Sequence, residues 1–293
     1  MSICTPTFNR RPFIPYLIKC VQNQTYPADR IDWVVVDDGT DPVEDLFLNL
    51  PRVRYFRYSE KMSIGKKRNI TNEYCMGSII IYMDDDDYYP PTRVIHAVST
   101  LINNPSYLLA GCLQMPMYFH ATGNIYLAGP YGDNRITAAT FAFRRELLDT
   151  TSFIESEFIS EEREFLKNYT IPVIPLDPEK TILVLSHPHN TINKEDSIHQ
   201  PNPYISRTTI NIEDVISDPD LFDFYVTRLC NVLENYECGK VSNKPDVLIS
   251  IKDTQIKRLT SKIKQLTMEN DRLTKLTDRL RALALNTIVN KSI

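Results

Sequence analysis

The sequence predicts an α/β protein with a mostly parallel sheet flanked by helices, followed by a helical extension and a coiled coil. Three observations support this fold class. Short apolar runs alternate with amphipathic stretches over the first hundred residues, two of the runs end in adjacent aspartates, and a heptad pattern occupies the C-terminal segment. Strands that alternate with helices pair in parallel, because each crossover helix brings the chain back to the same edge of the sheet.

Four consecutive aspartates, Asp84 to Asp87, directly follow the apolar, β-branched run 78–83. A run without polar alternation is typical of a strand buried on both faces. In open α/β sheets, ligands bind beyond the carboxyl ends of the strands, and adjacent carboxylates repel one another unless a cation compensates. These acids therefore predict a Mg²⁺ or Mn²⁺ site shared with a substrate phosphate, in preference to an acidic surface loop.

The other elements of the first hundred residues follow the same alternation. Apolar residues at 14, 17, 18 and 21 recur at helical spacing after Pro12, which is a favoured residue at a helix start. Strands are expected at 2–5, 33–36, 52–57 and 78–83, and helices begin near Pro12, Gly65 and Pro91. We expect the alternating order β-α-β-α-β-α-β, which indicates a doubly wound sheet of the nucleotide-binding type.

The middle of the chain is less regular. Short apolar runs and turn residues predict further strands, and two longer stretches have a helical pattern. Strands are expected at 107–118, 123–127, 140–143 and 181–185, and helices at 160–168 and 212–236. Residues 239–245 have the composition of a linker.

The C-terminal segment has an apolar heptad pattern. Its a positions are Ile249, Ile256, Ile263, Asn270, Thr277 and Ala284, and its d positions include Leu259, Leu266, Leu273 and Leu280. A sustained a/d pattern predicts a coiled coil, and one asparagine at an a position fixes the register of a parallel dimer. We therefore expect a homo-oligomer, with a first domain at 1–205, a helical appendage and linker at 206–245, and a coiled coil at 246–287.

Composition and charge exclude several classes of protein. The net charge is −4, with nine Lys/Arg and four Asp/Glu in residues 252–281, so no general nucleic-acid signal exists. No apolar run approaches the ~18 to 20 residues of a membrane span, and the first expected strand leaves no room for a signal peptide. The sequence favours a cytoplasmic protein. Its six cysteines form no CxxC pair, which favours buried free thiols.

Four motifs resemble those of the family-2 glycosyltransferases, which have the GT-A fold. They are PTFNR at 6–10, VDDGT at 36–40, GKKRN at 65–69 and YMDDDD at 82–87, in the order of the family. The resemblance covers about residues 1–195 and does not include the heptads.

The resemblance implies a nucleotide-sugar donor of UDP type. Phe8 takes the position that stacks on the base, Asp38 the one that hydrogen-bonds the base, and Arg68 the one that meets the diphosphate. The implied nucleotide-binding residues are Pro6, Thr7, Phe8, Arg10, Asp38, Lys66, Arg68, Asp84 and Asp85.

The same resemblance implies a metal-dependent transfer. Asp84 and Asp86 match the family's DxD motif, and His187 matches a later histidine, so the implied ligands of Mn²⁺ or Mg²⁺ are Asp86, Asp84 and His187. The catalytic base comes from an acidic pair that Glu161 and Glu162 resemble.

Glu162 is the favoured base of the two glutamates. In an expected helix 160–168 it lies three and four positions before Phe165 and Leu166, on the face that turns to the core. Glu161 shares a face with Phe165 alone. In the first turn of a helix, both glutamates also have a purely structural explanation through the helix dipole.

These expectations describe an enzyme that transfers one sugar at a time. A metal together with Arg68 and Lys66 neutralises the departing diphosphate, and a carboxylate deprotonates the acceptor hydroxyl. The acceptor is a glycan, a protein or a small molecule. The QxxRW signature of processive synthases is missing, since Trp33 is the only tryptophan. The alternatives are a sugar nucleotidyltransferase and a catalytically inactive coiled-coil structural protein.

Overall fold

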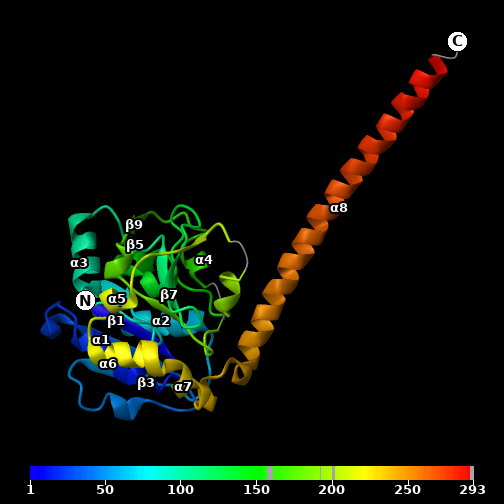
Figure 1. Cartoon of the computed structure of the whole chain (residues 1–293). Helices are drawn as coiled ribbons and strands as arrows, with labels where there is room; N and C mark the ends of the chain where they lie inside the picture. Colours follow the sequence, from blue (N-terminus) through cyan, green and yellow to red (C-terminus); the bar gives the residue numbers. More distant parts are fainter. Residues whose placement is uncertain (157–160, 192, 200–201, 291–293) are drawn as a thin grey trace. The chain divides into compact units, whose positions relative to one another are not determined.

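A computed structural model describes residues 1–156, 161–191, 193–199 and 202–290 of the chain (Figure 1). The chain divides into two compact units, Met1–Pro245 and Asp246–Ile293. The described part of the second unit is helical throughout. Over the described ranges, no helix is both long enough and apolar enough to cross a membrane.

The main sheet of the first unit has seven strands in the order β3-β2-β1-β4-β8-β5-β9. β1, β2, β3 and β4 are mutually parallel where they pair, whereas β8 is antiparallel to both of its neighbours. The strands are β1 (Ser2–Thr7), β2 (Asp32–Asp37), β3 (Val53–Arg57), β4 (Ile79–Tyr82), β5 (Leu109–Gly111), β8 (Ala142–Arg144) and β9 (Val173–Pro175). The predicted α/β class with a mostly parallel sheet is confirmed.

Three helices cover this sheet. They are α1 (Ile14–Gln22), α2 (Ile64–Tyr74) and α3 (Arg93–Asn103). Apolar side chains of α1 and α3 pack in one core cluster with Ile3 and Val35, and those of α2 pack in the other with Cys4 and Val34. Because successive strand residues point to opposite faces, α1 and α3 lie on one face of the sheet and α2 lies on the other.

The expected order β-α-β-α-β-α-β is wrong at the connection between β2 and β3. That connection contains only the 3₁₀ turn Glu44–Leu46. Pro42 and Pro51 bound it, and proline interrupts helical hydrogen bonding. Val43 and Phe47 are nevertheless buried and attach the connection to the core.

The expected strand 107–118 is also wrong, because it divides into two strands of different sheets. β5 belongs to the main sheet, and β6 (Met115–Phe119) belongs to a second sheet of order β10-β6-β7-β11. The other strands there are β7 (Asn124–Ala128), β10 (Val184–Ser186) and β11 (Ile205–Arg207). The chain leaves the main sheet at Cys112, where the amide donates to Thr140 Oγ1 at 3.1 Å and not to a strand.

The two expected helices in the middle of the chain are shorter than the sequence indicates. The first is the single turn α4 (Glu162–Phe165), since Lys167, Asn168 and Tyr169 have positive φ angles that end it; Ser160 lies outside the described residues. The stretch 212–236 breaks before Pro219 into α5 (Ile212–Val215), α6 (Pro219–Phe222), a π-helical turn (Asp223–Arg228) and α7 (Leu229–Glu234). The six cysteines are free thiols, four of them buried.

The second unit consists of the long helix α8 (Pro245–Asn290), which Figure 1 draws in orange to red. Its heptad leucines are exposed in the single chain, from 50% for Leu266 to 62% for Leu259. The helix includes the predicted a and d positions up to Thr277 and Leu280. Ala284 lies beyond the residues whose side chains are described. Pairing of this helix with a second copy stays a prediction.

Candidate active site

The loops that follow β1, β2 and β4 meet at one edge of the main sheet. β1 lies between the two other strands, with Thr7 beside Asp37 and Cys4 beside Tyr82. Because all three strands are parallel, their carboxyl ends share this edge. The PTFNR, VDDGT and DDDD motifs, far apart in sequence, are therefore brought together as predicted from the alternation of strands and helices.

Lys67 contacts both Asp38 and Phe8 at this edge. The Lys67 ammonium forms an ion pair with Asp38, donates to the Thr7 carbonyl at 2.9 Å, and lies 5.6 Å from the centre of the Phe8 ring. The second oxygen of Asp38 accepts from the Met62 amide at 2.6 Å. The acid expected at the base-binding position is thus fixed in place, and its charge is neutralised.

Lys67 was missed by the sequence reasoning, which selected Lys66. The structure exposes Lys66 and leaves Lys67 only 5% exposed. In helix α2, residues 67 and 68 share the buried face with Thr71 and Asn72, which follow each of them by four positions. This spacing was the signal that could have identified Lys67.

Arg68 connects two of the predicted site acids. Its terminal nitrogens bind both carboxylate oxygens of Asp84 at 3.1 Å, and its Nε donates to Glu161 at 2.9 Å. The guanidinium also lies over the Tyr82 ring at 4.7 Å and is 4% exposed. In this structure Arg68 holds Asp84 and Glu161 in fixed positions.

The two glutamates expected to include the base differ in their surroundings. Glu161 is buried and paired with Arg68. Glu162 is half-buried; its burial, followed by the negative charge of Glu161, raises its pKa to about 7. A carboxylate with this pKa is suited to exchange protons near neutral pH.

Asp86 and His187 form the contact that is central to the predicted metal site. Their Oδ2 and Nε2 atoms are 3.2 Å apart, and Arg10 donates to the same Asp86 oxygen at 3.2 Å. Burial opposes ionisation of Asp86, but Arg10 and the hydrogen bond from His187 outweigh it and hold the pKa of Asp86 below its usual range. Burial lowers the pKa of His187 to about 3, so its imidazole is neutral.

Asp85 and Asp87 have other surroundings than Asp86. Burial, and then the charge of Asp86, raises the pKa of Asp85 to about 7, and Arg10 Nε lies 3.6 Å from its carboxylate. Asp87 accepts from the Leu185 amide at 3.2 Å, which attaches the acidic loop to β10. Asp87 is therefore a structural member of the run.

The residues present fit a divalent cation in part. Two neighbouring ligands of an octahedral ion with ~2.1 Å bonds lie about 3 Å apart, which matches the Asp86 and His187 pair. The ionised carboxylate is the required state, whereas His187 Nδ1 accepts from the His189 amide at 3.2 Å, so the proton of the neutral imidazole is on Nε2 and would move to Nδ1 when a metal binds. Asp84, the third expected ligand, accepts from Arg68 with both of its oxygens, and its role as a metal ligand stays a prediction. Within the described ranges, no group of three or more His, Cys, Asp or Glu side chains is placed to hold a metal.

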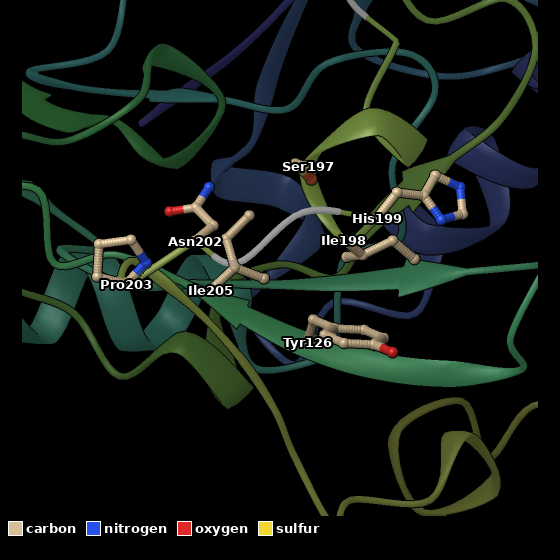
Figure 2. A pocket seen from close by; sticks show the side chains of 7 residues that line it. All are labelled: Tyr126, Ser197, Ile198, His199, Asn202, Pro203 and Ile205. Carbon is tan, nitrogen blue, oxygen red and sulfur yellow. The ribbon is translucent and has the colours of Figure 1, made fainter.

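A separate hollow of about 600 Å³ lies over the second sheet (Figure 2). Tyr126 of β7 and Ile205 of β11 line it together with side chains of the connection between β10 and β11: Ser197, Ile198, His199, Asn202 and Pro203. None of the predicted donor-site residues contributes to it. The acid-bearing edge and this hollow are therefore two different features.

A parallel sheet with acidic and basic loops at one edge defines this unit as a GT-A-type domain. Residues 2–158 match the family model described as Glycosyl transferase family 2, so the chain belongs to this family. The resemblance drawn from the four motifs is confirmed.

Two curated relatives match parts of the chain. An uncharacterized glycosyltransferase of Haemophilus influenzae is 24% identical over 108 residues, which are 36% of each chain. A GalNAc(5)-diNAcBac-PP-undecaprenol beta-1,3-glucosyltransferase of Campylobacter jejuni is 29% identical over 93 residues, which are 30% of this chain and 29% of the relative. The matches thus span about a third of these relatives.

Solved structures share the fold at low sequence identity. The mannosyltransferase PcManGT from Pyrobaculum calidifontis, in complex with GDP-Man and Mn²⁺, has a TM-score of 0.52 and 15% identity, over 87% of this chain and 74% of its own. S. aureus TarS 1-349 in complex with UDP has a TM-score of 0.50 and 20% identity, over 64% and 61%.

Proposed function

We propose that the chain is a metal-dependent, inverting glycosyltransferase that moves a sugar from a nucleotide diphosphate, with UDP favoured, to an acceptor hydroxyl. The observation that supports this most directly is the 3.2 Å contact of Asp86 with His187, beside Arg10 and at the edge that also bears Phe8 and Asp38. The GDP-Man and Mn²⁺ in PcManGT and the UDP in TarS are consistent with such a donor.

The donor is expected to lie across the carboxyl ends of β1, β2 and β4. The half-buried Phe8 ring offers a face for the base, and Asp38, fixed by Lys67 and the Met62 amide, presents an acceptor to it. Asp84 is held by Arg68 with both of its oxygens. In this arrangement Arg68 positions Asp84, and Arg10 is the arginine next to the proposed metal ligands.

A bound Mn²⁺ or Mg²⁺ would supply charge for the leaving diphosphate, with Asp86 and His187 as its protein ligands and donor oxygens completing the shell. Arg10 adds positive charge at the same place. Glu162 removes the proton of the acceptor hydroxyl as that oxygen attacks the sugar. A direct attack from the side opposite the diphosphate inverts the configuration at the sugar carbon.

The chain lacks the loop that the alternative activity, that of a sugar nucleotidyltransferase, requires. Such enzymes bind the triphosphate with a glycine-rich basic loop after the first strand, whereas the loop 6–10 contains no glycine. The family match also favours sugar transfer. Nucleotide release from sugar donors tests the other alternative, an inactive structural protein.

We also propose that residues 246–287 pair with a second copy in a parallel coiled coil. Helix α8 exposes a row of isoleucines and leucines at a/d spacing, and such a long helix buries little of its own surface. The single Asn270 at an a position selects the parallel register. The partner is therefore a second copy of this chain.

Calorimetry tests the metal-dependent donor site. UDP is titrated into the full-length protein with Mn²⁺ and again with excess chelator, and the Asp86→Ala variant is titrated in parallel. The proposal expects binding with Mn²⁺, a large loss with chelator, and the same loss for Asp86→Ala. Equal binding in all three titrations would contradict the metal site.

A further inference from the structure

Residues 236–244, which precede helix α8, belong to the first unit and lie against the carboxyl ends of β1, β2 and β4, the donor edge. The Cys238 carbonyl accepts from the Asn9 side chain at 2.9 Å, and the Tyr236 hydroxyl donates to Asp41 at 2.8 Å. Both partners follow strands of the donor edge. The segment is thus attached to the loops that bear Phe8 and Asp38, although the two contacts join residues 229 and 195 positions apart in sequence.

Gly239 shows how closely this segment approaches the edge. A Cβ atom at Gly239 would lie 2.5 Å from Nδ1 of His189 and 3.1 Å from the Asn9 carbonyl oxygen. Only a residue without a side chain fits between these two groups. The close packing fixes the path of the chain over the last residues before α8.

This path places Lys244 inside the donor edge. Its backbone amide closes a 3₁₀ turn on the Val241 carbonyl at 2.9 Å, and its side chain is directed to Phe8, with the ammonium 5.7 Å from the ring centre. Lys244 is only 4% exposed. A buried lysine is unusual unless an opposite charge accompanies it.

Among the residues that the structure describes, no carboxylate lies within ion-pair distance of the Lys244 ammonium. Two further lysines lie over the Phe8 ring, Lys61 at 4.9 Å and Lys67 at 5.6 Å, and Lys67 pairs with Asp38. Burial, followed by the charge of Arg10, lowers the pKa of Lys244 to about 7, while the charges of Asp85 and Asp86 act in the opposite direction. Arg10 thus pairs with Asp85 and Asp86, whereas the positive charge of Lys244 has no carboxylate partner among the described residues.

An anion of the donor would supply the missing negative charge. The Lys244 ammonium lies beside Phe8, and Arg10 donates to Asp86 at 3.2 Å, so a diphosphate that extends from a base on Phe8 towards Asp86 would come near both cations. We propose that Lys244 is a donor-binding residue whose ammonium pairs with this diphosphate, so that the Lys244 side chain forms part of one wall of the donor site. This inference rests on the proposed function and adds a residue from outside the motifs of the first hundred positions.

The test uses the full-length Lys244→Met variant, in which a side chain of similar length has no charge. The matched control is Lys240→Met, since Lys240 lies in the same segment but pairs with Glu237 and is not in contact with Phe8. Calorimetry with UDP and with UMP, both with Mn²⁺, gives the affinities. Thermal unfolding without nucleotide measures the structural effect of each exchange.

Loss of a charge-assisted contact is expected to weaken UDP binding by about 10- to 100-fold in Lys244→Met. The loss for UMP is smaller, because UMP lacks the second phosphate. Lys240→Met keeps the affinity of the wild type, and Lys244→Arg recovers part of the loss. The unfolding temperature of Lys244→Met stays equal or rises, because an unpaired buried charge has been removed.

The outcomes separate this inference from the proposed function. If the wild type binds UDP and Lys244→Met binds it equally well, the inference is wrong and the donor site stands. Equal losses for UMP and UDP would overturn the assignment to the diphosphate, as would a lower unfolding temperature with unchanged affinity. If the wild type does not bind UDP in the presence of Mn²⁺, the proposed UDP-type donor site itself fails.

Discussion

Exchange of Glu162 for glutamine is expected to stop sugar transfer and to leave donor binding intact. Glutamine has the size of glutamate but accepts no proton. Removal of a general base typically lowers turnover by about 10²- to 10⁴-fold. Glu162 makes no ion pair among the described residues, unlike Glu161, so the exchange leaves no buried partner unpaired. The affinity for UDP therefore stays within a factor of about two of the wild type.

Turnover is also expected to rise with pH, because the proposed base Glu162 must be deprotonated. Glu162 acts as a base only when it is deprotonated, and its pKa of about 7 reflects burial and the charge of Glu161, with Arg68, Asp84 and Tyr169 as the other nearby groups. About one molecule in eleven has the carboxylate at pH 6 and about ten in eleven at pH 8, so turnover rises roughly tenfold over this range. Glu162→Gln loses this rise.

Glu161→Gln is the matched control for Glu162→Gln. It weakens the 2.9 Å hydrogen bond to the Arg68 Nε atom, a charge-assisted contact of ~1.5 to 3 kcal/mol, and so lowers the free energy of unfolding. Turnover is expected to fall less than in Glu162→Gln. Steady-state nucleotide release, UDP calorimetry and thermal unfolding are measured for both variants. The reverse ranking in turnover would move the base to Glu161. Near-normal transfer in both would place it elsewhere, with Asp133 and His189 next to be tested.

Further predictions concern the remaining parts of the molecule. Gly65→Ala is expected to lower the free energy of unfolding by about 1 to 3 kcal/mol in denaturant titrations, because its Cβ would lie 2.1 Å from the Ile154 carbonyl oxygen; unchanged stability would refute this packing. Light scattering should show an oligomer at full length and a monomer after truncation behind Lys244. Leu266→Asp should weaken the oligomer, whereas the f-position exchange Met268→Asp should not, and a monomeric wild type would contradict the coiled coil. Chelation of the metal should lower UDP affinity as strongly as Asp86→Ala does.

Much of the donor edge was predictable from short-range patterns. The apolar run before Asp84 identified β4, and the alternation of strands with helices placed Asp38 and Asp86 at the same edge. Both inferences need only the period of the strand and the rule for parallel crossovers. The apolar run 140–143 predicted the β8 strand, but its antiparallel position between β4 and β5 has no such local signal, because these neighbours are distant in sequence.

Side-chain partners across the site were beyond the sequence. Arg68 pairs with Glu161, 93 positions away, and this contact accompanies the burial of Glu161. The sequence did not show which of the two glutamates has this partner. The choice of Lys67 over Lys66 depends on the orientation of helix α2, which a shift of one residue changes by about 100°. Lys244 lies in a stretch with the composition of a linker, so only the fold could bring it to Phe8.

The central claim is transfer from a nucleotide sugar, and release of nucleotide tests it most directly. The full-length protein is incubated with a panel of UDP- and GDP-sugars, with Mn²⁺ or with excess chelator, and free nucleotide is measured over time. The account predicts release from at least one donor, dependent on Mn²⁺ and lost in both Asp86→Ala and Glu162→Gln. Release that continues in the presence of chelator and in both variants, or no release from any donor with Mn²⁺, would contradict it.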